Sequence, residues 1–106
     1  MSFRDAQDTV DRWIGQFEEG YFPPLANVAR LAEEVGEVAR EVNHRFGPKV
    51  KKADEPPADL GRELADVLFV VICLANSQQI DLDRSFDAMM GEITARDASR
   101  WTRKAR

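Results

Sequence analysis

One segment limits the possible folds of this chain more than any other. Residues 63–76 read ELADVLFVVICLAN, and every position from Val67 to Ala75 is apolar. These nine positions are well short of the roughly 20 that a membrane-spanning helix needs. A helix that is apolar nearly all round is instead buried inside protein. We therefore expect this segment to be the central helix of a water-soluble fold.

The remaining sequence also predicts helices, because helix formers dominate and no segment alternates apolar and polar residues as a half-buried strand does. Ser2 and Asp5 predict a capping box, and Asp81 predicts an N-cap. Gly20 and the Gly47–Pro48 pair are stop signals. We expect four helices, at about residues 3–19, 24–45, 58 to 78 or 79, and 82–100.

Four helices with mostly short connections predict a single domain over residues 1–106 of the all-α class, built as an antiparallel four-helix bundle-like protomer. Each helix then turns an apolar stripe toward the core. The expected stripes are Val10, Trp13, Ile14 and Phe17 in the first helix, Val28, Leu31, Val35, Val38 and Val42 in the second, and Phe86, Met89, Met90 and Ile93 in the fourth.

Charge and cysteine content argue against some partners and locations. The formal net charge is −4 and the sequence pI is about 5.0, which disfavours a nucleic-acid polymer as partner. Cys73 is the only cysteine and lies in the apolar run, as a core thiol in a reducing compartment would. The N-terminal sequence MSFRDAQDTV has no apolar signal region. We expect a cytoplasmic protein with no membrane partner.

Acidic residues crowd the second helix, where Glu33, Glu34 and Glu37 are followed by Glu41. Like charges three and four residues apart repel one another by a few tenths of a kcal/mol per pair. An ordinary surface explanation exists, because Arg30 can pair with Glu34 and Arg40 can pair with Glu37. The second helix alone therefore leaves a solvated face and a cation site both open.

The third helix favours the cation site. Glu63 and Asp66 are three residues apart, and the side of the helix that holds Asp66 continues into apolar residues such as Phe69. A buried carboxylate is costly unless it is paired or bound to metal. Arg62 is the only basic residue near Asp66 along this helix.

Packed side by side, the two helices would present five carboxylates. An all-oxygen cluster selects a hard cation, so we expect Mg²⁺ or Mn²⁺. Mg²⁺ commonly binds phosphate oxygens together with one or two carboxylates. The pattern therefore favours metal-assisted hydrolysis of a polyphosphate.

The acidic pattern also resembles a known family. Glu33-Glu34-x-x-Glu37 followed, after 25 intervening residues, by Glu63-x-x-Asp66 is similar to the EExxE…ExxD signature of the MazG-like all-α nucleotide pyrophosphohydrolases. The likeness is greatest to the short single-domain (YpjD-like) branch. It extends over IGQFEEGYFPPLANVARLAEEVGEVAREVNHRFG, ELADVLFVVICLANSQQIDL and RDASRWTRK, which together cover nearly the whole chain.

The resemblance implies hydrolysis of a nucleoside triphosphate between the α and β phosphates. It also suggests that the enzyme removes unwanted nucleotides from the pool, a house-cleaning role. Glu34, Glu37, Glu63 and Asp66 match the family's metal ligands, and Glu33 matches the position that orients or deprotonates the attacking water. Family members form dimers or tetramers. We expect a homodimer or homotetramer here, because four short helices alone would hardly bury both the small-residue flank of the second helix and the apolar third helix.

The phosphate-binding residues depart from the family pattern. Many relatives carry an Asn and a Lys on the last helix, where this sequence reads Met90-Gly91-Glu92. Four basic residues are the candidates to replace that pair: Lys51, Lys52, Arg96 and Arg100. Four aromatic residues are candidates to stack on the nucleobase, although the first two also belong to the apolar stripe of the first helix: Trp13, Phe17, Tyr21 and Phe22.

Two other functions fit parts of the sequence. Glu41 and His44 form a Glu-x-x-His spacing that occurs in di-iron carboxylate bundles. Against this, the five-acid cluster is complete without His44, which we expect to cap or pack near the end of the second helix, while Glu41 stays at the surface. The other alternative is a non-enzymatic helical module that binds a protein partner through its apolar surfaces.

Overall fold

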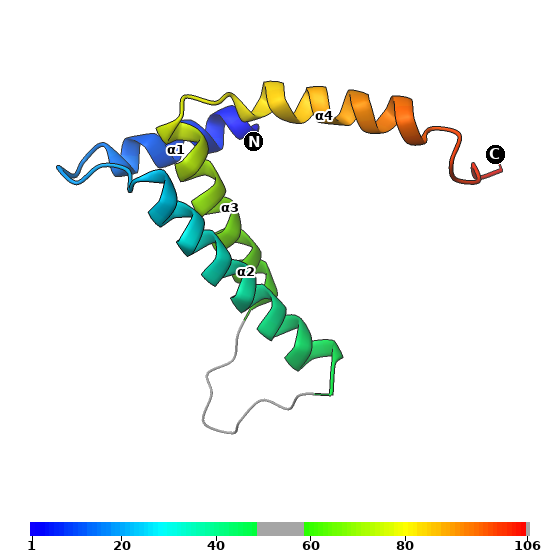
Figure 1. Cartoon of the computed structure of the whole chain (residues 1–106), viewed down its shortest axis with the longest axis horizontal. Helices are drawn as coiled ribbons and strands as arrows, with labels where there is room; N and C mark the ends of the chain where they lie inside the picture. Colours follow the sequence, from blue (N-terminus) through cyan, green and yellow to red (C-terminus); the bar gives the residue numbers. More distant parts are fainter. Residues whose placement is uncertain (49–58, 106) are drawn as a thin grey trace.

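The computed structural model describes residues 1–48 and 59–105, and these residues form four helices and no strand (Figure 1). The helices are α1 (Phe3–Ile14), α2 (Pro24–Phe46), α3 (Leu60–Ser77) and α4 (Leu82–Asp97). The predicted all-α class is therefore confirmed. The capping box of Ser2 and Asp5 is present at the start of α1, and Asp81 caps α4 as predicted.

The first helix is shorter than predicted. It ends at Ile14 with Gly15 at its C-cap, five residues before the expected end at residue 19. The chain then turns through Gly20, whose φ of 62° lies in the left-handed region that glycine tolerates best. Phe17 is thus outside the helix, although its ring still packs edge-on against Trp13 at 5.1 Å.

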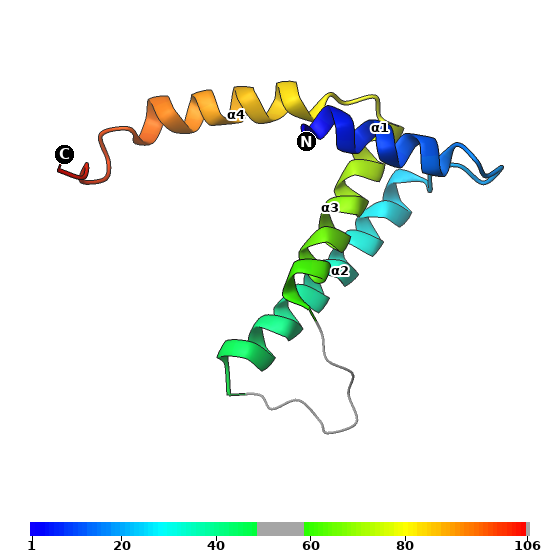
Figure 2. The ribbon, with the colours of Figure 1, turned by 180° about the vertical axis from the view of Figure 1, so that it is seen from behind.

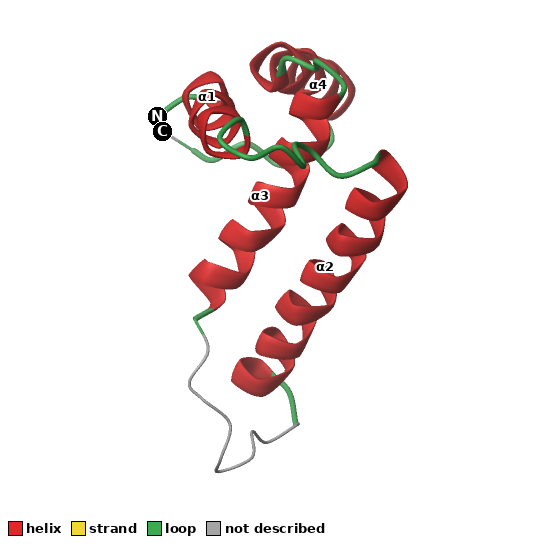
Figure 3. Cartoon of the chain, turned by 90° about the vertical axis from the view of Figure 1, so that its left-hand side faces the viewer, coloured by secondary structure: helices red, strands yellow, loops and turns green. Residues whose placement is uncertain are grey.

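The centre of the fold is an antiparallel pair formed by α2 and α3 (Figure 1). Helix α1 lies across the end of this pair and contacts α3, as the view from the other side also shows (Figure 2). Helix α4 lies beside α1, where Figure 3 shows both helices nearly end-on, and it then extends away from the α2–α3 pair (Figure 1). A single copy therefore leaves much of α4 uncovered.

Within residues 1–48 and 59–105, the buried apolar residues all belong to α3, which confirms the apolar segment as the core helix. They are Val70, Ile72, Cys73 and Ala75. The stripes predicted for the other helices are largely wrong for a single protomer. Their exposed members are Trp13, Phe17, Val28, Val35, Val42, Phe86, Met89 and Met90. The other helices of the same copy cover these residues only in part; Phe86, for example, packs against Phe3 of α1 at 5.2 Å and still stays exposed.

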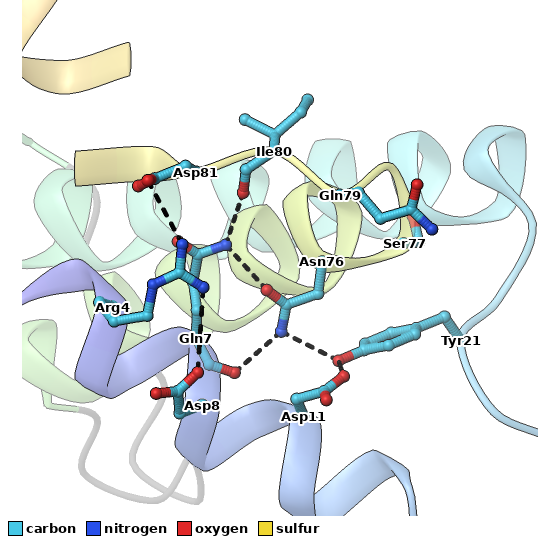
Figure 4. Close-up of a pocket in the computed structure, with 10 residues that line it drawn as sticks. All are labelled: Arg4, Gln7, Asp8, Asp11, Tyr21, Asn76, Ser77, Gln79, Ile80 and Asp81. Atoms are coloured by element: carbon cyan, nitrogen blue, oxygen red, sulfur yellow. Dashed lines mark hydrogen bonds and ion pairs between the residues drawn. The ribbon is translucent and has the colours of Figure 1, made fainter. Parts of the chain in front are cut away.

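Helix α1 is joined to α3 by side-chain hydrogen bonds (Figure 4). Gln7 is 3% exposed, and its Nε2 donates to Asn76 Oδ1 and to the main-chain carbonyl of Ile80, both at 2.8 Å. The Leu82 amide donates to Gln7 Oε1 at 3.1 Å. Asn76 Nδ2 donates to the Gln7 carbonyl at 3.0 Å and to the Tyr21 hydroxyl at 2.9 Å. We call these residues the α1–α3 anchor.

The protomer is open for its size. Its radius of gyration is 17.8 Å, whereas about 13 Å is expected for a compact domain of this length. Its accessible surface is 8548 Å², against roughly 6,000 Å² for a compact folded chain of this mass. No helix in the described ranges has both the length and the apolar character needed to cross a membrane.

Candidate metal centre

Three of the predicted acidic residues meet between α2 and α3. Glu34, Glu63 and Asp66 each offer a carboxylate oxygen, and these oxygens lie within 4.8 Å of one another. The antiparallel pairing explains the meeting, because it sets the middle of α2 against the first turns of α3. All three side chains are half-buried. Closely spaced carboxylate oxygens with no sulfur or imidazole among them suit a hard divalent cation.

The electrostatics of this group show the cost of crowding. Partial burial raises the pKa of Glu63, and the charges of Asp66, Glu37, Glu34 and Glu41 raise it further. A bound cation would oppose this repulsion.

Asp66 has one countercharge, which the sequence identified as the only local candidate. Arg62 Nε lies 3.0 Å from Asp66 Oδ1, and the hydrogen bond raises the pKa of the guanidinium. The Asp66 side chain is 34% exposed and that of Arg62 is 76% exposed. An exposed pair of this kind contributes about 0–1 kcal/mol. Asp66 therefore sits at the edge of the core, as predicted, and a cation can compete with Arg62 for it.

The two remaining acids of the motif lie outside the three-residue group. Glu37 is exposed on α2, one turn beyond Glu34, and it is close enough for its charge to raise the pKa of Glu63. Glu33 is exposed and, being next to Glu34 in the sequence, points about 100° away around the helix. The structure thus brings together three of the four predicted ligands and places the fourth nearby.

The expectation that Glu41 lies at the surface is wrong. Glu41 is 6% exposed and its Oε1 lies 3.9 Å from Arg45 Nε. It is seven residues after Glu34 and therefore on the same face of α2, the face that packs against α3. His44 is partly buried near the end of the helix, as expected, and its Nδ1 has no hydrogen-bond partner.

The described residues give the di-iron alternative no support. Among them, the one cluster of three or more potential metal ligands contains neither Glu41 nor His44. The surface explanation for the acids also fails in part, since no ion pair joins Arg30 to Glu34, both of which the structure describes.

Of the four predicted phosphate-binding residues, the structure describes Arg96 and Arg100, and neither lies beside the acidic group of its own protomer. Lys51 and Lys52 lie outside the described residues. Arg96 and Arg100 both pair with Asp97, at 2.9 and 3.6 Å, near the end of α4. Because α4 extends away from α2 and α3 (Figure 1), these arginines do not reach the acidic group of their own protomer.

A cavity lies next to the acidic group. Some of its lining residues were candidates in the sequence, but the sequence did not predict that they enclose a cavity. It has a volume of about 190 Å³ and is bordered by α1, the turn after it, α2 and α3. We call it the aromatic cavity, and its lining residues include Trp13, Tyr21, Phe22, Asn27, Arg30 and Phe69.

Helical geometry sets this cavity beside the carboxylates. Asn27 and Arg30 precede Glu34 by seven and four residues, and Phe69 follows Asp66 by three. At 1.5 Å per residue the cavity begins about 5 Å from the acidic group along both helices. Three of the four aromatic residues proposed for base stacking line it, and Phe17 does not.

Arg30 is the basic residue that sequence reasoning missed as part of the site. Its guanidinium carbon lies 5.4 Å from the centre of the Phe22 ring, a cation–π distance. Burial raises the pKa of the Cys73 thiol, and the charge of Arg30 partly opposes that shift. The i,i+4 spacing to Glu34 concealed this placement, because it suggested an ordinary surface pair.

Comparisons with known proteins give a consistent result. The model of the MazG nucleotide pyrophosphohydrolase domain matches residues 22–101. YpjD of Bacillus subtilis strain 168, a protein described as uncharacterized, is 56% identical over 103 residues, which are 97% of this chain and 93% of that protein.

Two solved structures are also similar. One is the crystal structure of YPJD from Bacillus subtilis, described as a candidate pyrophosphatase. It matches with a TM-score of 0.79 and 55% sequence identity, and the match covers 87% of this chain and 94% of the YPJD chain. The Bacillus-conserved MazG protein, described as a nucleotide pyrophosphohydrolase, has a TM-score of 0.77 at 48% identity, with coverage of 88% and 90%.

Proposed function

The chain belongs to the MazG nucleotide pyrophosphohydrolase family and is a hydrolase of nucleotide pyrophosphate bonds, and we propose that it converts a nucleoside triphosphate to the monophosphate and pyrophosphate in a Mg²⁺-dependent reaction. The observation that carries the proposal is the meeting of Glu34, Glu63 and Asp66 between α2 and α3. Such a group has little structural benefit of its own, because its charges raise the pKa of Glu63 and repel one another.

The donor set fits a magnesium ion. Glu34, Glu63 and Asp66 would hold it, with Glu37 completing the set from the next turn of α2. All donors are carboxylate oxygens, which Mg²⁺ and Mn²⁺ prefer over the nitrogen and sulfur ligands typical of zinc. When bound, such an ion neutralises charge on the phosphates and lowers the pKa of bound water.

The chain's own residues supply the remaining chemistry. Glu33 is the proposed general base, which takes the proton of a water molecule whose oxygen attacks the α phosphorus. The bond from that phosphorus to the oxygen bridging the α and β phosphates then breaks, and pyrophosphate leaves. Arg30 is the proposed cation on the nucleoside side, since its guanidinium is not paired with Glu34 and borders the cavity next to the acidic group.

The aromatic cavity is the proposed site of the nucleoside. The rings of Trp13, Tyr21 and Phe22 line it, and its near edge begins about 5 Å from the acidic group along α2 and α3. A base that enters the cavity would leave its phosphates directed toward the acidic group. Aromatic faces stack on any base with a contribution of about 1–3 kcal/mol.

We also propose that the working protein is a homodimer or homotetramer. The excess accessible surface of the protomer, roughly 2,500 Å² over a compact chain, is of the size that one subunit contributes to an obligate interface. An apolar groove of about 340 Å³ lies where α3 meets the first turns of α4, bordered by residues such as Leu68, Phe86 and Met89. A second copy of the chain is its proposed occupant.

A reaction of this kind in the cytoplasm would remove unwanted nucleotides from the pool, which is the house-cleaning role we propose. The test is pyrophosphate release from a panel of canonical and damaged ribo- and deoxyribonucleoside triphosphates, with Mg²⁺ or Mn²⁺. We expect turnover of at least one nucleotide by the wild type and a large loss in Glu37→Ala. If no nucleotide in the panel is cleaved, or if Glu37→Ala keeps full activity, the proposal is wrong.

A further inference from the structure

The aromatic cavity contains one polar side chain that is almost completely buried. Asn27 is 1% exposed, which makes it the most buried residue of α2 within the described part of the chain. Its neighbours along the cavity wall are mostly aromatic or aliphatic, including Ile14, Phe22 and Phe69. A buried amide costs free energy unless its donors and acceptor find partners.

The orientation of the Asn27 amide follows from its one side-chain hydrogen bond. Nδ2 donates to the main-chain carbonyl of Phe22 at 3.3 Å. A carbonyl oxygen can only accept, so the amide nitrogen must occupy this side. Oδ1 therefore lies on the other side, and no residue in the described ranges donates a hydrogen bond to it.

The Oδ1 atom of Asn27 is not fully enclosed. Among the described residues, the only fully enclosed side-chain nitrogen or oxygen without a partner is His44 Nδ1. Because Asn27 lines the aromatic cavity, its Oδ1 is an acceptor without a partner on a residue of the cavity wall. The hydrogen bond from Nδ2 to the Phe22 carbonyl fixes the orientation of the amide.

We propose that Asn27 determines base specificity by accepting, through Oδ1, a hydrogen bond from an amino or ring N–H group of the nucleobase. This proposal rests on the proposed function, because it assigns a specificity-determining residue to the proposed nucleoside site. The substrate class is a nucleotide whose base presents a donor on the edge that enters the cavity. Arg30, on the next turn of α2, is the donor available to an acceptor on the same base.

The expected selectivity follows from burial. A base without the donor would enter the cavity and leave Oδ1 desolvated and unpaired, which opposes its binding. Sites that hydrogen-bond a substrate group reject analogues lacking it far more strongly than apolar pockets reject a change of size. Removing the donor should therefore lower kcat/KM by about tenfold or more.

The test compares nucleoside triphosphates in pairs that differ by one donor: cytosine and its 4-desamino form, adenine and purine, guanine and hypoxanthine, and uracil and N3-methyluracil. kcat/KM is measured for the wild type, for Asn27→Leu and for Asn43→Leu. The last variant makes the same substitution on the exposed surface of α2. Thermal unfolding verifies that each variant is folded.

We expect the wild type to prefer the donor-bearing member of its favoured pair by about tenfold or more. Asn43→Leu should keep this ratio, and Asn27→Leu should bring it near one. The proposal is overturned if the wild type cleaves nucleotides but treats all pairs alike, a result that needs no variant to fold. It is also overturned if a folded Asn27→Leu keeps the preference. If the wild type cleaves no nucleotide, the proposed function itself fails and this proposal with it.

Discussion

Arg62 and a metal cation would compete for the carboxylate of Asp66, and this competition determines how the protein should respond to metal. Its carboxylate lies within 4.8 Å of those of Glu34 and Glu63 and also accepts a hydrogen bond from Arg62 at 3.0 Å. The Arg62 pair is exposed and therefore weak. The repulsion within the acidic group is relieved either by a cation or by removal of one charge.

Replacing Asp66 tests this balance. In Asp66→Asn we expect the metal-free protein to unfold at an equal or slightly higher temperature, because one repelling charge is gone. Mg²⁺ at about 100 times its dissociation constant should stabilise the wild type by about 2.7 kcal/mol and the variant by much less. Calorimetry with and without Mg²⁺ measures both effects. Asp8→Asn, at an exposed position on α1, is the control, and an equal Mg²⁺ response in Asp66→Asn would contradict the assignment.

Tyr21 gives a prediction for alkaline pH. Burial and the hydrogen bond that it donates to Asp11 at 2.6 Å raise the pKa of Tyr21 to about 12. A raised pKa means that the neutral phenol favours the folded state. Its contribution is complete below the ordinary pKa near 10 and is lost as pH rises toward 12.

We expect a loss of about 1 kcal/mol from this group, since the phenol keeps some contact with water. Tyr21 is the only tyrosine, so tyrosinate absorbance in the native protein reports its titration directly. Denaturant unfolding of the wild type and of Tyr21→Phe should converge as pH rises through this window. Titration near pH 10 in the folded protein would contradict the partial burial of Tyr21 and its hydrogen bond to Asp11.

Among the elements, α2 shows why the sequence predicted the motif better than the packing. Asn27, Glu34 and Glu41 are each seven residues apart, and all three lie on the face turned toward α3. Val28 and Val35 each follow one of these residues by one position, so the apolar stripe predicted a contact face turned about 100° around the helix from the observed one. A rule that apolar residues face the core fails here because the contact face of α2 carries the site.

Helix α3 was predictable for the opposite reason. It is apolar nearly all round, so its burial does not depend on choosing a face. The spacing of Glu63 and Asp66 then fixed where the acids would lie relative to the core. What the spacing could not give was the cavity, because the cavity depends on where α1 and the turn after it meet α2 and α3.

The placement of α1 depends on the polar anchor, which no apolar pattern predicts. Gln7 makes three side-chain hydrogen bonds although it is almost fully buried. Gln7→Leu would leave the Ile80 carbonyl and the Leu82 amide without partners. We expect the free energy of unfolding to fall by about 2–3 kcal/mol.

Denaturant unfolding at a fixed protein concentration measures this loss. Gln16→Leu, in the exposed turn after α1, is the matched control and should cost well under 1 kcal/mol. The available signals for the anchor in the sequence were weak: Asn76 directly follows the apolar run of α3, and Gln7 lies one turn before Val10 on the stripe side of α1. If both variants were equally stable, hydrogen bonding would not be what positions α1.

At the scale of the whole molecule, the open shape predicts association. The exposed stripe of α4, which includes Phe86 and Met89, borders the apolar groove beside α3. Helix α2 also exposes Val28 and Val35, which would be buried only if a second copy covered α2 as well. The oligomer would bury the stripes that the sequence predicted to be buried within one protomer.

Analytical ultracentrifugation tests this association. The wild type should sediment with a mass at least twice the 12.0 kDa of one chain. Met89→Glu should shift the distribution toward the monomer, because it places a charge in the apolar groove. Ala95→Glu, on the opposite side of α4 by helical geometry, should leave the mass unchanged. A wild type that sediments as a monomer at every concentration would contradict the proposed assembly.

The central claim is that the carboxylates between α2 and α3 support metal-dependent release of pyrophosphate. The most direct test measures pyrophosphate release with Mg²⁺ and with chelator for the wild type, for Glu34→Gln and for Glu92→Gln on α4. We predict that the chelator abolishes activity and that Glu34→Gln loses about 100-fold or more in kcat/KM, while Glu92→Gln keeps the wild-type rate. Activity in Glu34→Gln equal to that of the wild type, or hydrolysis that persists in chelator, would contradict the account.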